Sequence, residues 1–141
     1  MAQSLNVSRR GNSLSGQSTV EFAIIAVVAM FVLFLGIQFA LLGNAALAVG
    51  QLAYQGSRYA SINSSLPPST LQNNISAMAS PTIAGNGLTV NVTFQTPIVQ
   101  TVTSVTVQVT FSAQRLILLP NPFFGVPFPS TLSSTNIALV D

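Results

Sequence analysis

The sequence predicts an α+β protein, in which a long N-terminal helix packs on a small antiparallel β-sheet of about three strands. Three observations carry this prediction. Residues 22–42 contain no charged side chain, a helix-compatible pattern continues without proline as far as residue 62, and apolar residues alternate with polar ones beyond residue 87. A run of about 20 apolar residues is typical of a membrane-spanning helix, and a period of two is typical of half-buried strands.

The apolar run at 22–42 is long enough to cross a bilayer. At about 1.5 Å per residue it measures about 31 Å, close to the bilayer core of about 30 Å. Arg9 and Arg10 precede it, and no basic residue lies close to its other end. Because basic residues stay on the cytoplasmic side, we expect a cytoplasmic N-terminus and an exported C-terminal part.

Helical character continues beyond the apolar run, over residues 43–62. From Gly36 onwards, small residues recur at a seven-residue interval. They form a seam on one face of the helix, where another helix can approach closely. The alternative for the stretch from 50 to 60 is a plain amphipathic helix that packs on the chain's own C-terminal domain. Both interpretations stay open, because each can apply to a different face of the same helix. The seam residues are Gly36, Gly43, Gly50 and Ser57, joined by Ala46, Ala53 and Ala60.

The C-terminal part predicts the sheet. Pro67 and Pro68 cannot continue a helix, so the long helix ends near residue 63, and a short helix is expected within 69–79. The strands are expected at 88–95, at 105–111 with a start as early as Ile98, and at 130–140. Between the last two lies a segment rich in proline and phenylalanine, 118–129. We expect its aromatic rings to pack under the sheet; the alternative is an adhesive or subunit-docking loop.

The composition argues against catalysis and nucleic-acid binding. The chain has no His, Cys or Lys, and its acids are Glu21 and Asp141. No general-base pair, thiol nucleophile or metal-ligand cluster can therefore be assembled, and we expect no enzyme activity and no cofactor or metal. The four arginines are too dispersed to follow a phosphate backbone. Arg58 and Tyr59 are interpreted as surface residues near a helix end rather than as a binding pair.

Glu21 stands directly before the apolar run, five residues after Gly16. A carboxylate near lipid costs several kcal/mol unless it is paired, hydrated or neutralised, so such a residue usually has a function and a partner. The alternative, an acid that only complements the helix macrodipole, does not explain the glycine at this distance.

These residues resemble the processing site of type IV pilin-like proteins, and more specifically the TadE branch of tight-adherence (Flp-type) pilus systems. The resemblance rests on three stretches. They are the Gly-Gln-x-x-Val-Glu-Phe-Ala form at 16–23, the helix tail at 44–61, and the Val-x-Val-x-Val-x-Phe strand at 105–111 with the following Leu-Pro and Gly-Val-Pro.

The resemblance implies a structural pilin or pseudopilin. A prepilin peptidase would cut between Gly16 and Gln17, and Glu21 would pair with the new amine of Gln17 in the same or a neighbouring subunit. Residues 1–16 would be a cleaved leader, 17–63 the helix for membrane insertion and polymerisation, and 64–141 an exported β domain. Among the helix residues assigned to membrane or polymer contacts are Phe22, Leu35, Gly36, Leu42, Gly43 and Gly50.

The implied partners are other pilin subunits, the peptidase, an inner-membrane assembly platform, and membrane lipid before assembly. The precursor would reside in the bacterial inner membrane and the product in an extracellular pilus that serves adhesion or surface colonisation. One rival is an uncleaved single-pass membrane protein that presents a small β binding module. A second rival, a secreted protein with a signal peptide, is disfavoured because the apolar stretch is long and lacks a small-x-small exit.

Overall fold

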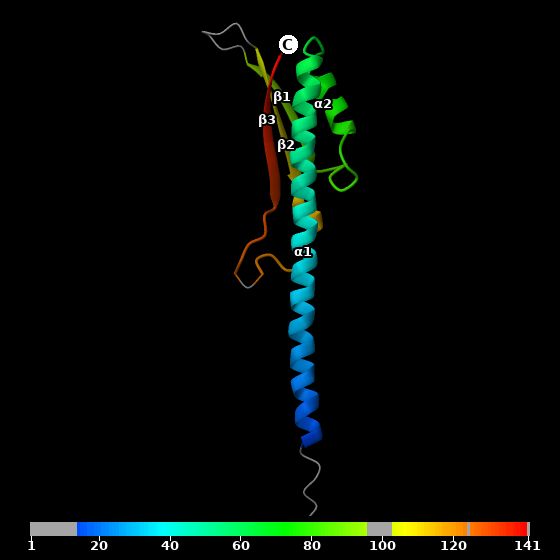
Figure 1. The fold of residues 1–141 in the computed structure, drawn as a ribbon, viewed down its shortest axis with the longest axis vertical. Helices are drawn as coiled ribbons and strands as arrows, with labels where there is room; N and C mark the ends of the chain where they lie inside the picture. Colours follow the sequence, from blue (N-terminus) through cyan, green and yellow to red (C-terminus); the bar gives the residue numbers. More distant parts are fainter. Residues whose placement is uncertain (1–13, 96–102, 124, 141) are drawn as a thin grey trace, which may run out of the picture. The chain divides into compact units, whose positions relative to one another are not determined.

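The computed structural model describes residues 14–95, 103–123 and 125–140, and it confirms the predicted α+β class (Figure 1). The chain divides into two compact units, residues 1–36 and 37–141, and helix α1 contributes to both. In chain order the elements are α1 (Leu14–Ile62), α2 (Pro68–Ala77), β1 (Leu88–Gln95), β2 (Ser104–Ser112), the 3-10 helix η1 (Ala113–Leu116) and β3 (Thr131–Leu139).

In the first unit, the described side chains form a helix without a buried face. Every side chain from 17 to 36 is exposed except Ala26 and Leu35, which are half-buried. A helix that is apolar all round has no solvent-facing side of its own and needs lipid or partner helices around it. By length and composition, α1 is the one helix in the described part of the chain that could cross a membrane.

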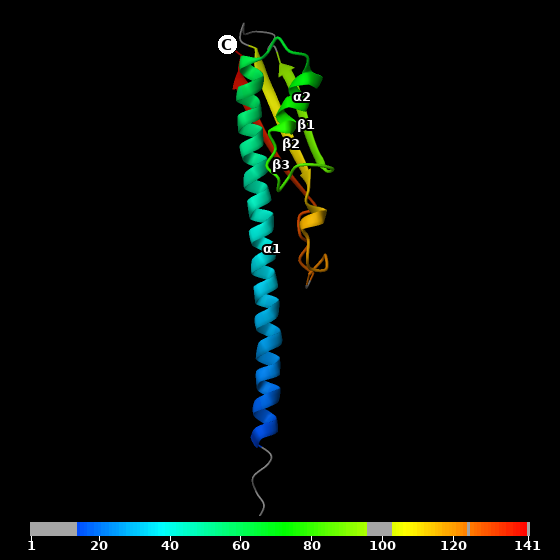
Figure 2. The same ribbon diagram turned by 90° about the vertical axis from the view of Figure 1, so that its right-hand side faces the viewer.

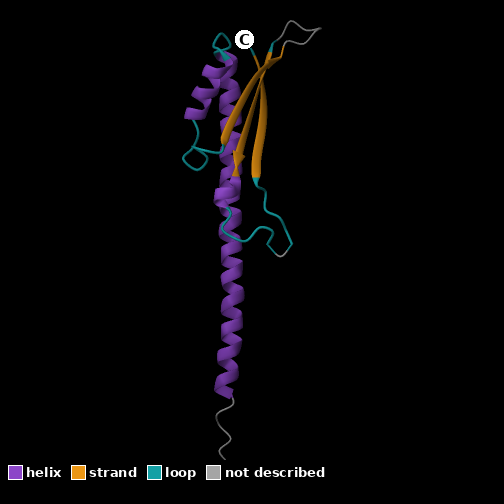
Figure 3. Ribbon diagram, turned by 180° about the vertical axis from the view of Figure 1, so that it is seen from behind, coloured by secondary structure: helices purple, strands orange, loops and turns teal. Residues whose placement is uncertain are grey.

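The second unit contains a three-stranded antiparallel sheet in the order β1-β2-β3 (Figure 3). The register places Val90 opposite Val109 and Val92 opposite Val107, so the valines of β1 and β2 share one face. Along β2, Val107 pairs on its other side with Asn136 of β3. The predicted alternation of apolar and polar residues therefore becomes a sheet with one apolar face.

The end of α1 towards Ile62 and the short helix α2 cover that apolar face (Figure 2). The burial of Val105, Val107 and Val109 in β2 alternates with more exposed residues, as a half-buried strand requires. The fully buried side chains of the core with the largest volumes come from both layers. They are Leu52, Leu71, Ile75, Ile83, Gln38, Val49, Val105, Val107 and Val109.

The helix boundaries follow from proline and asparagine. The backbone N–H of Asn63 and its side-chain Nδ2 both donate to the Tyr59 carbonyl, which closes the last turn of α1. Pro67 occupies the N-cap of α2, and Pro68 follows at the first helical position, where its missing N–H costs little. The short helix expected within 69–79 is therefore present.

The strands lie close to their predicted ranges. Strand β1 spans the predicted residues, and β3 is one residue shorter at each end than expected. The possible early start of the second strand at Ile98 falls in 96–102, outside the described residues. Strand β2 itself begins at Ser104 and leads directly into η1.

Candidate functional site

The predicted processing region lies at the start of α1. Gly16 and Gln17 are consecutive helical residues, and the Gln17 Nε2 atom donates a 3.2 Å hydrogen bond to Glu21 Oε1, with both side chains exposed. Glu21 does not belong to the first turn of α1, which contains no acid. Because macrodipole effects fade within the first turn, complementing the dipole does not account for Glu21 in the uncut chain.

The predicted membrane and polymer residues differ in their surroundings. Phe22 is exposed and Leu35 is half-buried in the first unit. A side chain added at Gly36 or Gly43 would meet no atom within 4 Å, so both glycines leave open space beside the helix. Leu42, by contrast, is buried within the second unit. The roles of these residues in a membrane or polymer remain predictions.

The seven-residue seam changes its environment along the helix. Gly36 and Gly43 are exposed, Gly50 is half-buried, and Ser57 is buried. An α-helix drifts by about 20° for every seven residues, so a strict seven-residue repeat turns slowly around it. Here the drift carries the repeat into the protein's own core, where Ala53 and Ala60 are also buried. Packing on the chain's own domain therefore describes the C-terminal end of the seam.

Gly56 is a close-packing position that the seven-residue pattern does not identify. A Cβ built on Gly56 would lie 2.8 Å from Ile75 Cγ2 and 3.3 Å from Val107 Cγ1. At this glycine, helix α1 thus lies against side chains of both α2 and β2. The spacing of Ala53, Gly56 and Ala60, at intervals of three and four residues, is the sequence signal for this buried face.

Gln38 is a second important residue without a role in the sequence predictions. Its side chain is fully buried, Nε2 donates to the Leu116 carbonyl at 3.0 Å, and Oε1 accepts from the Leu118 N–H at 2.7 Å. Gln38 is the single polar side chain in the run 22–42. A single glutamine in an apolar run indicates a residue with specific hydrogen-bond partners, because a buried amide without partners would cost several kcal/mol.

The segment 118–129 packs on α1 through one of its rings. Phe128 is buried, and its ring lies edge-on to Phe39 of α1, with centroids 6.2 Å apart and planes at 71°. Asn121 fixes the loop by accepting from the Phe128 N–H at 3.0 Å. Phe123 is half-buried, and Phe124 lies outside the described residues. The ring contact of Phe128 is therefore with the helix.

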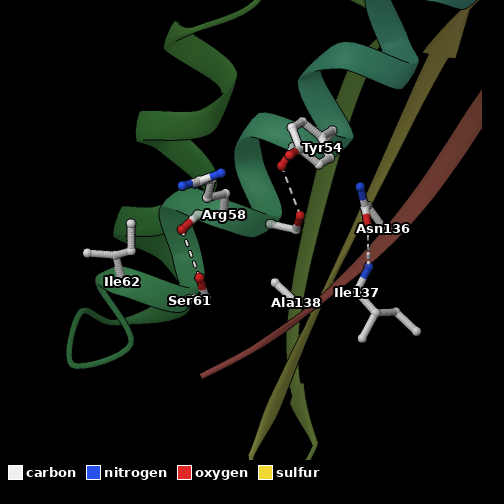
Figure 4. Close-up of a pocket in the computed structure, with 8 residues that line it drawn as sticks. Tyr54, Arg58, Ser61, Ile62, Asn136, Ile137 and Ala138 are labelled. Carbon is white, nitrogen blue, oxygen red and sulfur yellow. Dashed lines mark hydrogen bonds between the residues drawn. The ribbon is translucent and has the colours of Figure 1, made fainter. Parts of the chain in front are cut away.

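A recess of about 290 Å³ lies between α1 and β3, lined by Tyr54, Ser57, Arg58, Ser61, Ile62 and residues 136–138 (Figure 4). The hydroxyls of Ser57 and Ser61 donate to the helix carbonyls of Tyr54 and Arg58, so they are already satisfied. Tyr59, the predicted neighbour of Arg58, accepts a hydrogen bond from Asn74 and joins α1 to α2. The recess has no acid–base pair, and no metal-binding cluster of His, Cys, Asp or Glu occurs among the described residues.

These features define a class of proteins in which one long helix has an apolar N-terminal part, long enough to cross a membrane, and a C-terminal part that belongs to a small α+β domain. Residues 16–58 match the TadE family, described as TadE-like protein, and the match confirms the resemblance found in the sequence. The match covers the described helix from residue 16 to residue 58, so it shows a likeness to this family over that part of the chain. No curated protein and no solved structure matches the chain.

Proposed function

We propose that the chain is the precursor of a structural pilin or pseudopilin of a Tad pilus. It enters the inner membrane with its N-terminus in the cytoplasm, a prepilin peptidase cuts between Gly16 and Gln17, and an assembly platform transfers the product into a filament. The observation that carries this proposal is the apolar helix surface at 22–36, which has no buried face, within a segment that matches the TadE-like family.

Cleavage would change the position of Glu21 relative to the helix end. In the uncut chain it lies beyond the first turn, whereas in the product it would be the fifth residue, close to a new positive amine. The 3.2 Å contact between Gln17 Nε2 and Glu21 Oε1 supports this pairing, because it brings the carboxylate to residue 17 along the same helix face. Within a subunit or between neighbouring subunits, the carboxylate and the amine would neutralise each other in an apolar helix bundle.

Assembly would use the surface that lipid covers in the precursor. Gly36 and Gly43 leave open space beside α1, so helices of other subunits could approach the backbone there. The exported α+β domain would be displayed outside the bundle for adhesion or colonisation. In this role the chain is a substrate of the peptidase and catalyses no reaction itself.

The processing site is tested by mass spectrometry of the protein from its native membrane. We expect a product that begins at Gln17. Gly16→Leu should abolish this product, because a bulky side chain at the cut blocks the peptidase, whereas Gly11→Leu in the same leader should not. A mature protein that begins elsewhere would contradict the assigned cut.

The pairing role is tested by Glu21→Ala and Glu21→Gln, with Ser18→Ala as the matched control on the same exposed turn. Cleavage should continue in all three variants, while both Glu21 variants should enter sheared filaments poorly. Normal filament incorporation of Glu21→Gln would argue against charge pairing.

The uncleaved single-pass alternative remains open because of the recess beside Arg58, which could receive a ligand on a displayed β module. Retention of residues 1–16 in the purified protein would favour it. In that case, Arg58→Ala should weaken binding to surfaces or partner proteins while the membrane anchor stays intact.

A further inference from the structure

The segment 117–129 is fastened to α1 at a defined position along the helix. Gln38 holds the backbone on both sides of Ile117 through its bonds to Leu116 and Leu118. The contact of Phe128 with Phe39 attaches the far end of the same segment one residue further along the helix. Two independent contacts therefore fix the loop beside residues 38 and 39.

This attachment limits how much of α1 lipid can surround. From Gln38 onwards, Leu42, Ala45 and Val49 are buried in the domain, so one face of the helix is covered by protein. The apolar helix that precedes Gln38, residues 22–37, measures about 24 Å at about 1.5 Å per residue. That is shorter than a bilayer core of about 30 Å. If the apolar run spans the membrane, the outer leaflet must extend to Gln38 and the loop beside it.

The surface of the loop suits that environment. Leu118 is 58% exposed and Val126 is 64% exposed, and Phe39 on the adjoining helix turn is also exposed. No charged residue occurs from 116 to 140, and Arg115, exposed in η1, stands directly before the segment. Apolar side chains next to a single arginine fit a headgroup boundary, where the apolar groups enter lipid and the guanidinium reaches phosphate.

We propose that the described residues of this segment, 117–123 and 125–129, insert into the outer headgroup boundary of the phospholipid bilayer that holds the precursor, with Gln38 setting their depth. This inference rests on the proposed membrane insertion of α1. Its occupant is lipid: Leu118, Val126 and Phe39 are exposed apolar side chains beside the residues that follow the apolar run, and segment 117–129 contains no charged residue for a polar partner. The membrane would thereby hold the domain at two points, the helix and the loop.

The test uses the full-length precursor in vesicles of phosphatidylethanolamine and phosphatidylglycerol. The chain contains no cysteine, so single substitutions can each carry one fluorescent label. Val126→Cys reports on the loop, Thr135→Cys on the exposed side of β3, and Leu33→Cys on the helix span. Lipids with a nitroxide near the top of the acyl chain quench a label that lies at the boundary, and lipids with a nitroxide near the end of the acyl chain quench a label close to the bilayer centre.

We expect strong quenching of Leu33→Cys by the deep nitroxide, strong quenching of Val126→Cys by the shallow nitroxide, and weak quenching of Thr135→Cys by either. If the Leu33 label is quenched while the Val126 label behaves like the Thr135 label, the loop proposal is wrong and membrane insertion stands. If the Leu33 label is also unquenched, the proposed membrane insertion of α1 is wrong, and the loop proposal, which depends on it, is wrong as well. Shielding of Val126 that arises only in assembled filaments would identify a subunit rather than lipid as the occupant, and would overturn the proposal.

The role of Gln38 has its own variant. Adding Gln38→Leu to the Val126→Cys chain removes both hydrogen bonds while keeping the helix apolar. Because the contact of Phe128 with Phe39 remains, the Val126 label should lose part of its lipid quenching, with the Leu33 label unchanged in the matching double variant. Unchanged quenching at Val126 would overturn the assignment of Gln38 as the residue that sets the depth of the loop.

Discussion

The two parts of α1 have the same backbone geometry but opposite surroundings. From 17 to 36 no described side chain is buried, whereas from 37 to 62 one face of the helix lies in the core of the α+β domain. From residue 22 the N-terminal part is apolar on all sides, and the C-terminal part mixes small or apolar residues with polar ones. The comparison teaches that a helix apolar on all sides needs partners all round, whereas a helix with polar residues on one face needs a partner on the other face only.

The largest difference is expected from equal truncations at two leucines of the C-terminal part. Leu52 is 1% exposed and Leu47 is 68% exposed. Leu52→Ala should lower the free energy of unfolding by about 2–5 kcal/mol, since it leaves a cavity in the core. Leu47→Ala should change it by less than about 0.5 kcal/mol. Urea unfolding of the full-length chain in detergent, followed by near-ultraviolet circular dichroism of the tyrosines, measures both. Equal losses would contradict the assigned buried face.

Gln38 tests the boundary between the two parts. Gln38→Leu removes a donor and an acceptor from the Leu116 carbonyl and the Leu118 N–H, which should cost about 1–3 kcal/mol of unfolding free energy. Gln51→Leu, at an exposed position of the same helix, is the control and should have little effect. Amide hydrogen exchange at Leu118 should accelerate only in the Gln38 variant. Unaltered protection of that amide would show that the hydrogen bond does not hold the loop.

Two glycines should respond in opposite directions to the same substitution. Gly56→Ala places a methyl group against Ile75, with an overpacking cost of about 1–3 kcal/mol. Better helix propensity returns about 1 kcal/mol, so a net loss of about 0–2 kcal/mol remains. Gly43→Ala meets open space and should stabilise the helix by up to about 1 kcal/mol. Thermal unfolding of both variants measures the contrast, and stabilisation by Gly56→Ala would be inconsistent with the close contact.

The smallest effect is expected at the start of the helix. Gln17→Ala removes an exposed bond to Glu21, a type of pair that contributes about 0.2–0.5 kcal/mol in isolated helices. Far-ultraviolet circular dichroism in detergent should show nearly unchanged helix content and thermal stability. A loss comparable with that of Leu52→Ala would reveal a structural role for this end of α1.

The sequence was sufficient for the elements because their signals are local. Proline at 67 and 68 ends α1, and alternation of valine with polar residues predicts β1 and β2. The TadE-like resemblance was likewise visible in 16–23 and 44–61, and the family match at 16–58 confirms it. The division into leader, helix and exported domain, and the roles of Gly16, Gln17 and Glu21, remain predictions.

Long-range contacts were not predictable in the same way. Gln38 and Leu118 are 80 residues apart, and neither residue alone indicates the other. The seven-residue spacing of small residues is visible in the sequence. Whether the later residues of this repeat face the core depends on where the sheet packs against the helix. Gly56 was overlooked because its neighbours Ile75 and Val107 belong to two other elements. The spacing of Ala53, Gly56 and Ala60 indicates the buried face, but the two side chains that meet Gly56 become identifiable only when the faces of all three elements are combined.

The amide of Gln38 has a final consequence for a protein exposed to changing surroundings. A glutamine side chain neither gains nor loses a proton over the physiological range, and its dipoles are buried away from mobile ions. The attachment of the loop to α1 should therefore be equally firm in acidic and neutral media and in dilute and concentrated salt. An ion pair at the same position would have made the attachment of the loop sensitive to both pH and salt concentration.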